Sequence, residues 1–407
     1  MLQTIKSFYK EYPPQFWLIA FGVLVSSVGS SIIWPFQIVY MSEKLKDNPV
    51  TTIATLISIG SLTGLFISFI GGFVADRLGR KPIMFVAQAA HGIAYILMSR
   101  ANSYFAFLLP MTIMGAAMPF YAIGSDSMMA DMIPQQNRTN AYSVLRMINN
   151  AGIAIGPAIG GLLVSRSYTL AFDAASIGMI SYSLLLLFFV RETLNKQIQK
   201  HGEEKRKETL GGYDRVLQDK GFIRFVSIAT LGMIAPLMMW TLLALYTKNN
   251  YHIPEYLYSW LPVTNALMCV FMQYPVTAFT RRRPNQQMIA LGMFIYAIGV
   301  GSVALMTSFW GFLFSMILIT FGELTLVPTA STYVAAIAPE DLRGRYMTVY
   351  WLTWGMARAL APIIGGFLND AISPRAIWIG GLLFGLTSAL GLFLFNKESN
   401  TQTALHS

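Results

Sequence analysis

Stretches of about 20 predominantly apolar residues recur along the whole chain, and each can cross the roughly 30 Å hydrocarbon core of a membrane. Of the 407 residues, 55% are hydrophobic and 12% are charged, whereas an average soluble domain is about a quarter charged. Because the stretches and their short connections use the whole length, the sequence predicts an all-α integral membrane protein. We expect twelve spans, at 15–40, 53–75, 83–99, 104–130, 142–165, 169–190, 222–246, 257–279, 287–307, 310–337, 346–368 and 377–396.

The net charge of +10 is distributed in a way that indicates topology rather than nucleic-acid binding. With Arg224 counted in the central segment, 21 Lys and Arg residues lie on the side of the N-terminus and 6 on the other side. Positively charged loops stay in the cytoplasm, so we expect both termini there, in a multi-pass protein of the cell (plasma or inner) membrane. The partners expected are the lipid bilayer, protons and a small-molecule substrate, with no nucleic acid, and the chain is expected to be a monomer.

The charge-dense segment 191–221 divides the chain into two halves, 1–190 and 222–407. Its composition predicts a solvated linker between two six-helix bundles.

The halves resemble each other in sequence. Pro134 with Arg138, and Pro157 with Gly160 and Gly161, recur in the second half at one fixed offset, as Pro339 with Arg343 and Pro362 with Gly365 and Gly366. A repeat of this kind predicts two bundles related by an axis normal to the membrane, with a substrate site near the midplane and alternating access.

The loop after the second span reads Gly-Phe-Val-Ala-Asp-Arg-Leu-Gly-Arg-Lys-Pro from position 72 to 82. An acid at a helix end, a turn-permitting glycine and two cations can form a compact ion-pair cluster. This loop resembles the signature loop of the major facilitator superfamily, and the resemblance covers essentially the whole chain. It implies a pseudo-symmetric twelve-helix fold, contact of Asp76 with the start of the eleventh span, and an Arg80–Asp131 pair. The residues implied to control conformation are Gly72, Asp76, Arg77, Gly79, Arg80, Lys81, Asp131 and Arg138. In the second half, Phe279 replaces the acid, which argues against a symmetrical second cluster.

The fifth span resembles the motif of the antiporters of that superfamily, in its twelve-helix drug/proton branch. The residues that carry it are Gly152, Gly156, Pro157, Gly160 and Gly161. Glycines four residues apart allow close helix approach, and a proline permits a bend. Plain helix packing remains the alternative interpretation.

Four ionisable residues lie within or near predicted spans and are candidates for binding protons or substrate. Glu323 and Arg358 fall at comparable depth on adjacent spans, so we expect either a structural ion pair or a functional carboxylate at Glu323. Asp126 and Arg146 are expected to pair closer to the cytoplasmic side. The first span has no acid, although some relatives in the branch use one there, which argues against proton coupling.

Aromatic side chains on several predicted spans are candidates for the wall of a substrate cavity, suited to flat, apolar or cationic molecules. They are Trp34, Tyr40, Phe120, Tyr121, Trp240, Trp351 and Trp354.

The sequence does not favour an enzyme. It has no phosphate-binding loop and no His-Glu-x-x-His pair, and its four histidines are scattered, so no metal or other cofactor is expected. Without an ATP-binding domain, transport would draw on a gradient, and the proton gradient is the expected energy source. We expect a secondary transporter, favouring proton-coupled efflux of amphipathic or cationic small molecules (multidrug type). The alternatives are uptake or facilitated transport of a small metabolite, and a lipid-moving or sensory role.

Overall fold

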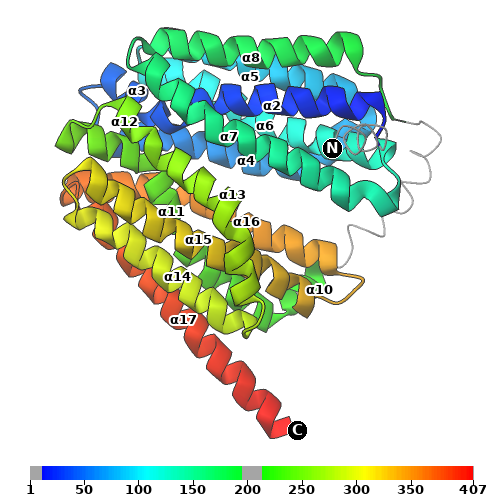
Figure 1. The fold of residues 1–407 in the computed structure, drawn as a ribbon, viewed down its shortest axis with the longest axis vertical. Coiled ribbons are helices and arrows are strands. Elements are labelled where there is room, and N and C mark those ends of the chain that lie inside the picture. Colours follow the sequence, from blue (N-terminus) through cyan, green and yellow to red (C-terminus); the bar gives the residue numbers. More distant parts are fainter. Residues whose placement is uncertain (1–11, 195–212, 407) are drawn as a thin grey trace. The chain divides into compact units, whose positions relative to one another are not determined.

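The computed structural model describes the backbone of residues 12–194 and 213–406, and these residues form helices and no strand (Figure 1). Each of the twelve predicted spans matches one long helix, counted with the short helices that continue it. The elements are α2 (Pro14–Ile33), η1 (Trp34–Phe36), α3 (Gln37–Lys44), α4 (Val50–Leu78), α5 (Arg80–Arg100), α6 (Tyr104–Met132), η2 (Gln135–Asn137), α7 (Arg138–Val164), α8 (Tyr168–Phe189), α10 (Tyr213–Gln218), α11 (Lys220–Tyr251), α12 (Glu255–Tyr258), α13 (Trp260–Thr280), α14 (Asn285–Ser302), η3 (Val303–Leu305), α15 (Phe309–Ile337), α16 (Arg343–Ala371) and α17 (Ala376–His406).

Ten of these helices are both long and apolar enough to cross a membrane. The two others, α13 and α16, are long enough but carry more polar side chains, including Asn265 and Gln273 on α13 and Arg358 on α16. Polar residues on spanning helices mark surfaces that face other helices or water. The two least apolar spans, α13 and α16, therefore carry polar groups that are candidates for a site.

The predicted repeat is confirmed in the helix boundaries. Shifted by the offset found in the sequence, the start and end of α6 give the start and end of α15, and the starts of α5 and α7 give those of α14 and α16. The serine caps also repeat, because Ser103 accepts a hydrogen bond from the third residue of α6 and Ser308 does the same in α15. The same local signal, a serine N-cap, thus sets the start of equivalent helices in the two halves.

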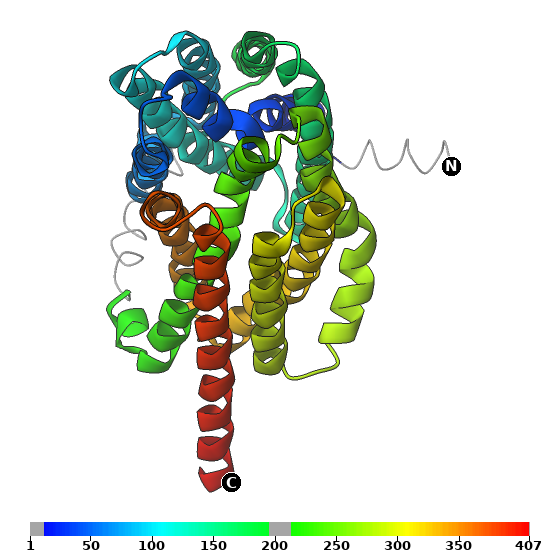
Figure 2. The same ribbon diagram turned by 90° about the vertical axis from the view of Figure 1, so that its left-hand side faces the viewer.

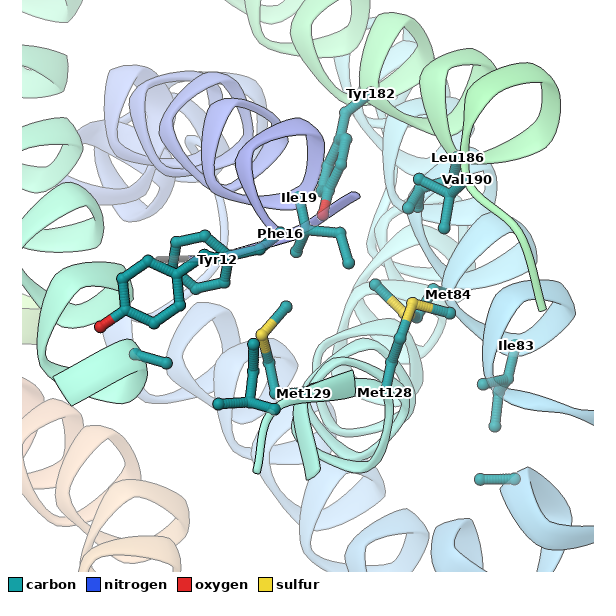
Figure 3. Packing of buried hydrophobic residues seen from close by; sticks show 13 residues of the cluster. Tyr12, Phe16, Ile19, Ile83, Met84, Met128, Met129, Tyr182, Leu186 and Val190 are labelled. Carbon is teal, nitrogen blue, oxygen red and sulfur yellow. The ribbon is translucent and has the colours of Figure 1, made fainter. Parts of the chain in front are cut away.

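Contacts divide the chain into two compact units, one of residues 1–45 with 59–204 and the other of residues 46–58 with 205–407. We call them the N-terminal and the C-terminal unit. In the N-terminal unit, a cluster of buried apolar side chains joins α2, α5, α6 and α8 (Figure 3). Phe16 stacks on Tyr12, and Met128 and Met129 extend the cluster across α6. Adaptable methionines fill the irregular space between these helices.

The antiporter-like motif forms the contact between α7 and α2. A Cβ added at Gly152 would lie 2.5 Å from the Ser27 Cβ, and one at Gly160 would lie 2.2 Å from the Ile32 carbonyl oxygen. Gly156, Pro157 and Gly161 are buried as well. The small residues let the two backbones touch, as expected for helix association in lipid.

We expect Gly160→Ala to destabilise the N-terminal unit by about 1–3 kcal/mol, because the new methyl group forces α2 away from α7. Thermal unfolding of the purified protein measures the loss. Gly344→Ala is the matched control, since a Cβ at Gly344 meets no atom within 4 Å. Equal melting temperatures for the two variants would contradict the close contact.

In the C-terminal unit, α14 packs between α15 and α17, while α11 packs on α16 and α17, and α13 packs on α15. Figure 2 shows α17 in red as one continuous helix beside these partners. The packing of α13 on α15 brings Asn265 of the first helix next to Glu323 of the second.

The predicted first domain, 1–190, requires a correction, because residues 46–58 group with the C-terminal unit. The physical reason is a helix cap. The Asp370 carboxylate, one residue before the end of α16, accepts hydrogen bonds from the backbone N–H groups of Val50 (3.2 Å) and Thr51 (2.7 Å) and from the Thr51 hydroxyl (2.7 Å). These contacts satisfy the free donors at the start of α4. Of the predicted linker 191–221, residues 195–212 lie outside the described residues.

Candidate functional site

The central polar feature of the C-terminal unit is a carboxylate in the middle of a spanning helix. Glu323 is 14 residues from each end of α15 (Phe309–Ile337), or about 21 Å of helix on either side. Its Oε2 accepts a hydrogen bond of 2.8 Å from the Asn265 amide on α13. The same amide nitrogen donates to the Thr320 hydroxyl at 3.1 Å. One amide thus ties together two polar groups on the neighbouring helix.

Apolar and weakly polar side chains surround this carboxylate. Gly322 lets α15 approach α14 closely, since a Cβ there would lie 2.6 Å from the Tyr296 backbone nitrogen. Tyr296 is fully buried, and both it and Cys269 are near enough to interact electrostatically with Glu323. Trp240 on α11 is a further polar neighbour of Tyr296. Burial of an ionised carboxylate among such side chains costs free energy unless a partner compensates the charge.

The expected Glu323–Arg358 pair is wrong: among the described residues, neither side chain has an ion-pair partner within 4 Å. The helix packing explains this result, because α15 packs chiefly on α13 and α14 and turns Glu323 toward Asn265, while α16 packs chiefly on α11. Arg358 lies near the middle of α16 and is exposed.

The expected Asp126–Arg146 pair is also absent from the described residues. Both side chains are exposed. A different hydrogen bond joins α6 and α7 near these residues: the Tyr142 hydroxyl donates to the Asp126 carbonyl oxygen at 3.0 Å. The helices α6 and α7 make few contacts with each other. Two charges at similar depths in the membrane therefore do not meet, although the sequence predicted that they would.

In the N-terminal unit, the signature loop forms an ion-pair cluster. The Arg80 guanidinium contacts Asp76 at 2.8 Å and Asp131 at 3.5 Å, the second contact being the pair that the resemblance implies. Gly79 has φ +101°, a conformation that favours glycine and allows the turn from α4 into α5. Arg138 donates to the carbonyl oxygens of Ala130 and Ile133 and so caps the end of α6.

The other loop residues lie at the edge of this cluster. Arg77 stacks over the Phe73 ring at 4.1 Å, Gly72 is half-buried on α4, and Lys81 takes part through its backbone N–H. Control of the conformational equilibrium by this loop stays a prediction.

Sequence reasoning missed Glu192, which completes the cluster. Its carboxylate accepts the backbone N–H groups of Arg80 (3.1 Å) and Lys81 (3.0 Å) at the start of α5. The neighbouring Thr193 hydroxyl donates to Asp131 at 3.0 Å. The segment after α8 therefore caps α5 and holds Asp131 beside Arg80. No local pattern around Glu192 reveals this role, because the contacts join segments that are far apart in the sequence.

The second half replaces the ion pair with an aromatic contact, as its sequence indicates. Arg283 lies over the Phe279 ring at 3.5 Å and donates to the Phe279 carbonyl oxygen at 3.0 Å. When the two loops are aligned, Phe279 and Arg283 correspond to Asp76 and Arg80.

The aromatic candidates have different surroundings. Tyr40 is wrong as a cavity residue: it is buried among Phe107, Tyr168 and Phe172, and its hydroxyl donates to the Ser99 carbonyl oxygen. Phe120 and Tyr121 pack against the cluster of Figure 3. The remaining candidates, Trp34, Trp240, Trp351 and Trp354, keep some exposed surface.

The family model of the Major Facilitator Superfamily matches the chain twice, at residues 19–248 and 221–406. The chain belongs to this superfamily and is a multi-pass membrane transporter, not an enzyme. It is 25% identical to a "Na(+), Li(+), K(+)/H(+) antiporter" of Planococcus maritimus over 88% of this chain and 87% of that protein. It is 21% identical to "Tetracycline resistance protein, class H" of Pasteurella multocida, over 94% and 96%. The structure of a POT family transporter in complex with 5-aminolevulinic acid superposes with a TM-score of 0.77 at 16% identity, covering 95% of this chain and 96% of that one.

We expect Glu192→Ala to destabilise the N-terminal unit by about 1 kcal/mol, because it removes the cap of α5. Amide hydrogen exchange measures the effect, and amides at the start of α5 should exchange about fivefold faster. The exposed Glu340 supplies the control: Glu340→Ala should leave the start of α5 unchanged. Unchanged exchange in Glu192→Ala would show that the cap does not form.

Proposed function

We propose that the protein exports amphipathic small molecules across the cell membrane in exchange for protons, with Glu323 as the proton-binding group. The observation that carries the proposal is the Glu323 carboxylate at the middle of α15, bonded to Asn265 and without a cationic side chain within 4 Å among the described residues. An isolated charge at this depth costs roughly 2.5–3.5 kcal/mol, and uptake of a proton removes that cost.

Asn265 suits such a proton site. Its amide nitrogen donates to Glu323 and Thr320, which supports the ionised carboxylate and orients the side chain. When a proton binds, the carboxyl group becomes neutral and gains a donor. The hydrogen bonds that join α13 to α15 then change, and this change is the link we propose between proton binding and alternating access.

The direction of transport is proposed from the relatives and from energetics. One relative is named as a Na(+), Li(+), K(+)/H(+) antiporter and another as a tetracycline resistance protein. A proton that enters across 100 mV supplies about 2.3 kcal/mol, enough to drive roughly 50-fold export of a neutral molecule. The glycine contact between α2 and α7 is compatible with this role but also serves simple packing.

A second candidate function is exchange of a monovalent metal cation for protons. Three oxygen-bearing side chains, those of Glu323, Asn265 and Thr320, lie together at the centre of the unit. Oxygen atoms are the ligands that hard cations prefer. The name of the Planococcus maritimus relative supports this candidate.

The experiment uses proteoliposomes under an imposed pH gradient, with a pH-sensitive dye to follow proton movement. We expect added amphipathic compounds to trigger proton movement, and Glu323→Gln to reduce it by about a hundredfold or more because the proton carrier is lost. Glu340→Gln is the isosteric control at an exposed site and should behave as the parent protein.

The other outcomes decide between the functions. Proton movement triggered by NaCl, LiCl or KCl, but not by the compounds, would establish cation exchange instead. Substrate flux without proton movement would show facilitated transport, the alternative function that the sequence also allows. Proton coupling intact in Glu323→Gln would remove Glu323 from the mechanism.

A further inference from the structure

Arg358 is the most unusual charge in the C-terminal unit. It lies 15 residues from the start and 13 from the end of α16 (Arg343–Ala371), or about 22 and 20 Å of helix. Among the described residues it has neither an ion pair within 4 Å nor a hydrogen bond, and its side chain is exposed. An arginine side chain extends only about 6 Å, so it cannot reach the lipid headgroups at either surface.

The residues around α16 indicate which way Arg358 points. The exposed apolar residues Met356, Leu360 and Phe367 fall within about 40° of one another on the helix circumference, at 100° per residue. Trp351 and Arg358 are about 20° apart, and their direction is about 170° from the centre of that apolar stripe. The apolar stripe suits lipid, whereas an intramembrane charge faces the protein interior or water. Arg358 therefore lies on the face of α16 that is turned from lipid.

Two tryptophans share that face with the arginine. Trp351 and Trp354 precede Arg358 by seven and four residues, and their ring centroids are 6.1 Å apart at an interplanar angle of 43°. Trp351 is 47% exposed. Indole rings stack on flat apolar groups, and a guanidinium binds carboxylate or sulfonate oxygens in pairs. It repels cations.

We propose that Arg358, Trp351 and Trp354 form a binding site for an amphipathic anion, a planar aromatic body that bears one carboxylate or sulfonate group. The site rests on the proposed function, because it names the class of substrate that the transporter carries. It replaces the preference for cations expected from aromatic content alone. Arg358 binds the anionic group, and the two indoles contact the aromatic body.

The experiment measures binding of three fluorescent probes that share one aromatic body to the purified full-length protein. The probes are 1-pyrenebutyrate, the neutral 1-pyrenebutanol and a pyrenebutyl-trimethylammonium salt. We expect the anion to bind at least tenfold more tightly than the other two, a difference of about 1.4 kcal/mol. Arg358→Gln should weaken binding of the anion about tenfold and leave the neutral alcohol unchanged, whereas Trp351→Ala should weaken all three probes.

Two further variants keep the test decisive. Arg358→Lys retains the charge without the planar fork and should bind the anion with intermediate affinity, which a merely structural role of Arg358 does not predict. Arg281→Gln changes an exposed arginine outside the site and should have no effect. Equal binding of the three probes, tightest binding of the cation, or equal weakening of all probes by Arg358→Gln would overturn the site.

Failure of this site and failure of the proposed function are distinguishable. Glu323→Gln should lose proton-coupled transport but still discriminate between the probes. Proton-coupled transport of neutral or cationic compounds, with no preference for the anion, would overturn the anion site and leave the proposed function standing.

Discussion

The hydrogen bond from the Asn265 amide to the Glu323 carboxylate is the contact on which the account of this transporter depends. In the low dielectric of a membrane span, an ionisable group must have a partner, reach water or change its charge. Glu323 has an amide partner rather than a cation, so its charge is stabilised only in part. We propose that this group takes up and releases a proton. Glu323 lies on α15, which packs against α13 within one unit.

The two halves share their helix boundaries but differ in their polar contacts. The N-terminal unit has an ion-pair cluster of Asp76, Arg80 and Asp131, whereas the C-terminal unit places Arg283 over Phe279 at the corresponding loop. The C-terminal unit carries Glu323 and Arg358 near the centres of its helices, where the corresponding positions in the first half are Met118 and Ile153. The fold is repeated, but the two charged side chains near helix centres, Glu323 and Arg358, have no charged counterpart at the equivalent positions of the first half.

Hydrophobic length and the fixed offset between the halves are signals that the sequence carries directly, and they predicted the helices and the repeat correctly. The Arg80–Asp131 contact followed from a loop whose spacing is characteristic of the family. The Glu323–Arg358 pair failed for a physical reason, because comparable depth does not specify which faces of two helices meet. Asn265 was detectable in principle, since an amide within an apolar span needs a partner. Glu192 and Asp370 were not, because each caps a helix that is distant in sequence.

The most direct test of the central claim is chemical modification of Glu323 with a hydrophobic carbodiimide, which reacts with protonated carboxyl groups in apolar surroundings. Mass spectrometry locates the adduct while proton-coupled transport is followed in parallel proteoliposomes. The account predicts that loss of transport rises in proportion to the adduct at Glu323, that the adduct decreases as pH rises, and that substrate slows its formation. Continued coupled transport in protein fully modified at Glu323, or complete inhibition with the adduct only at Asp126, would contradict the account.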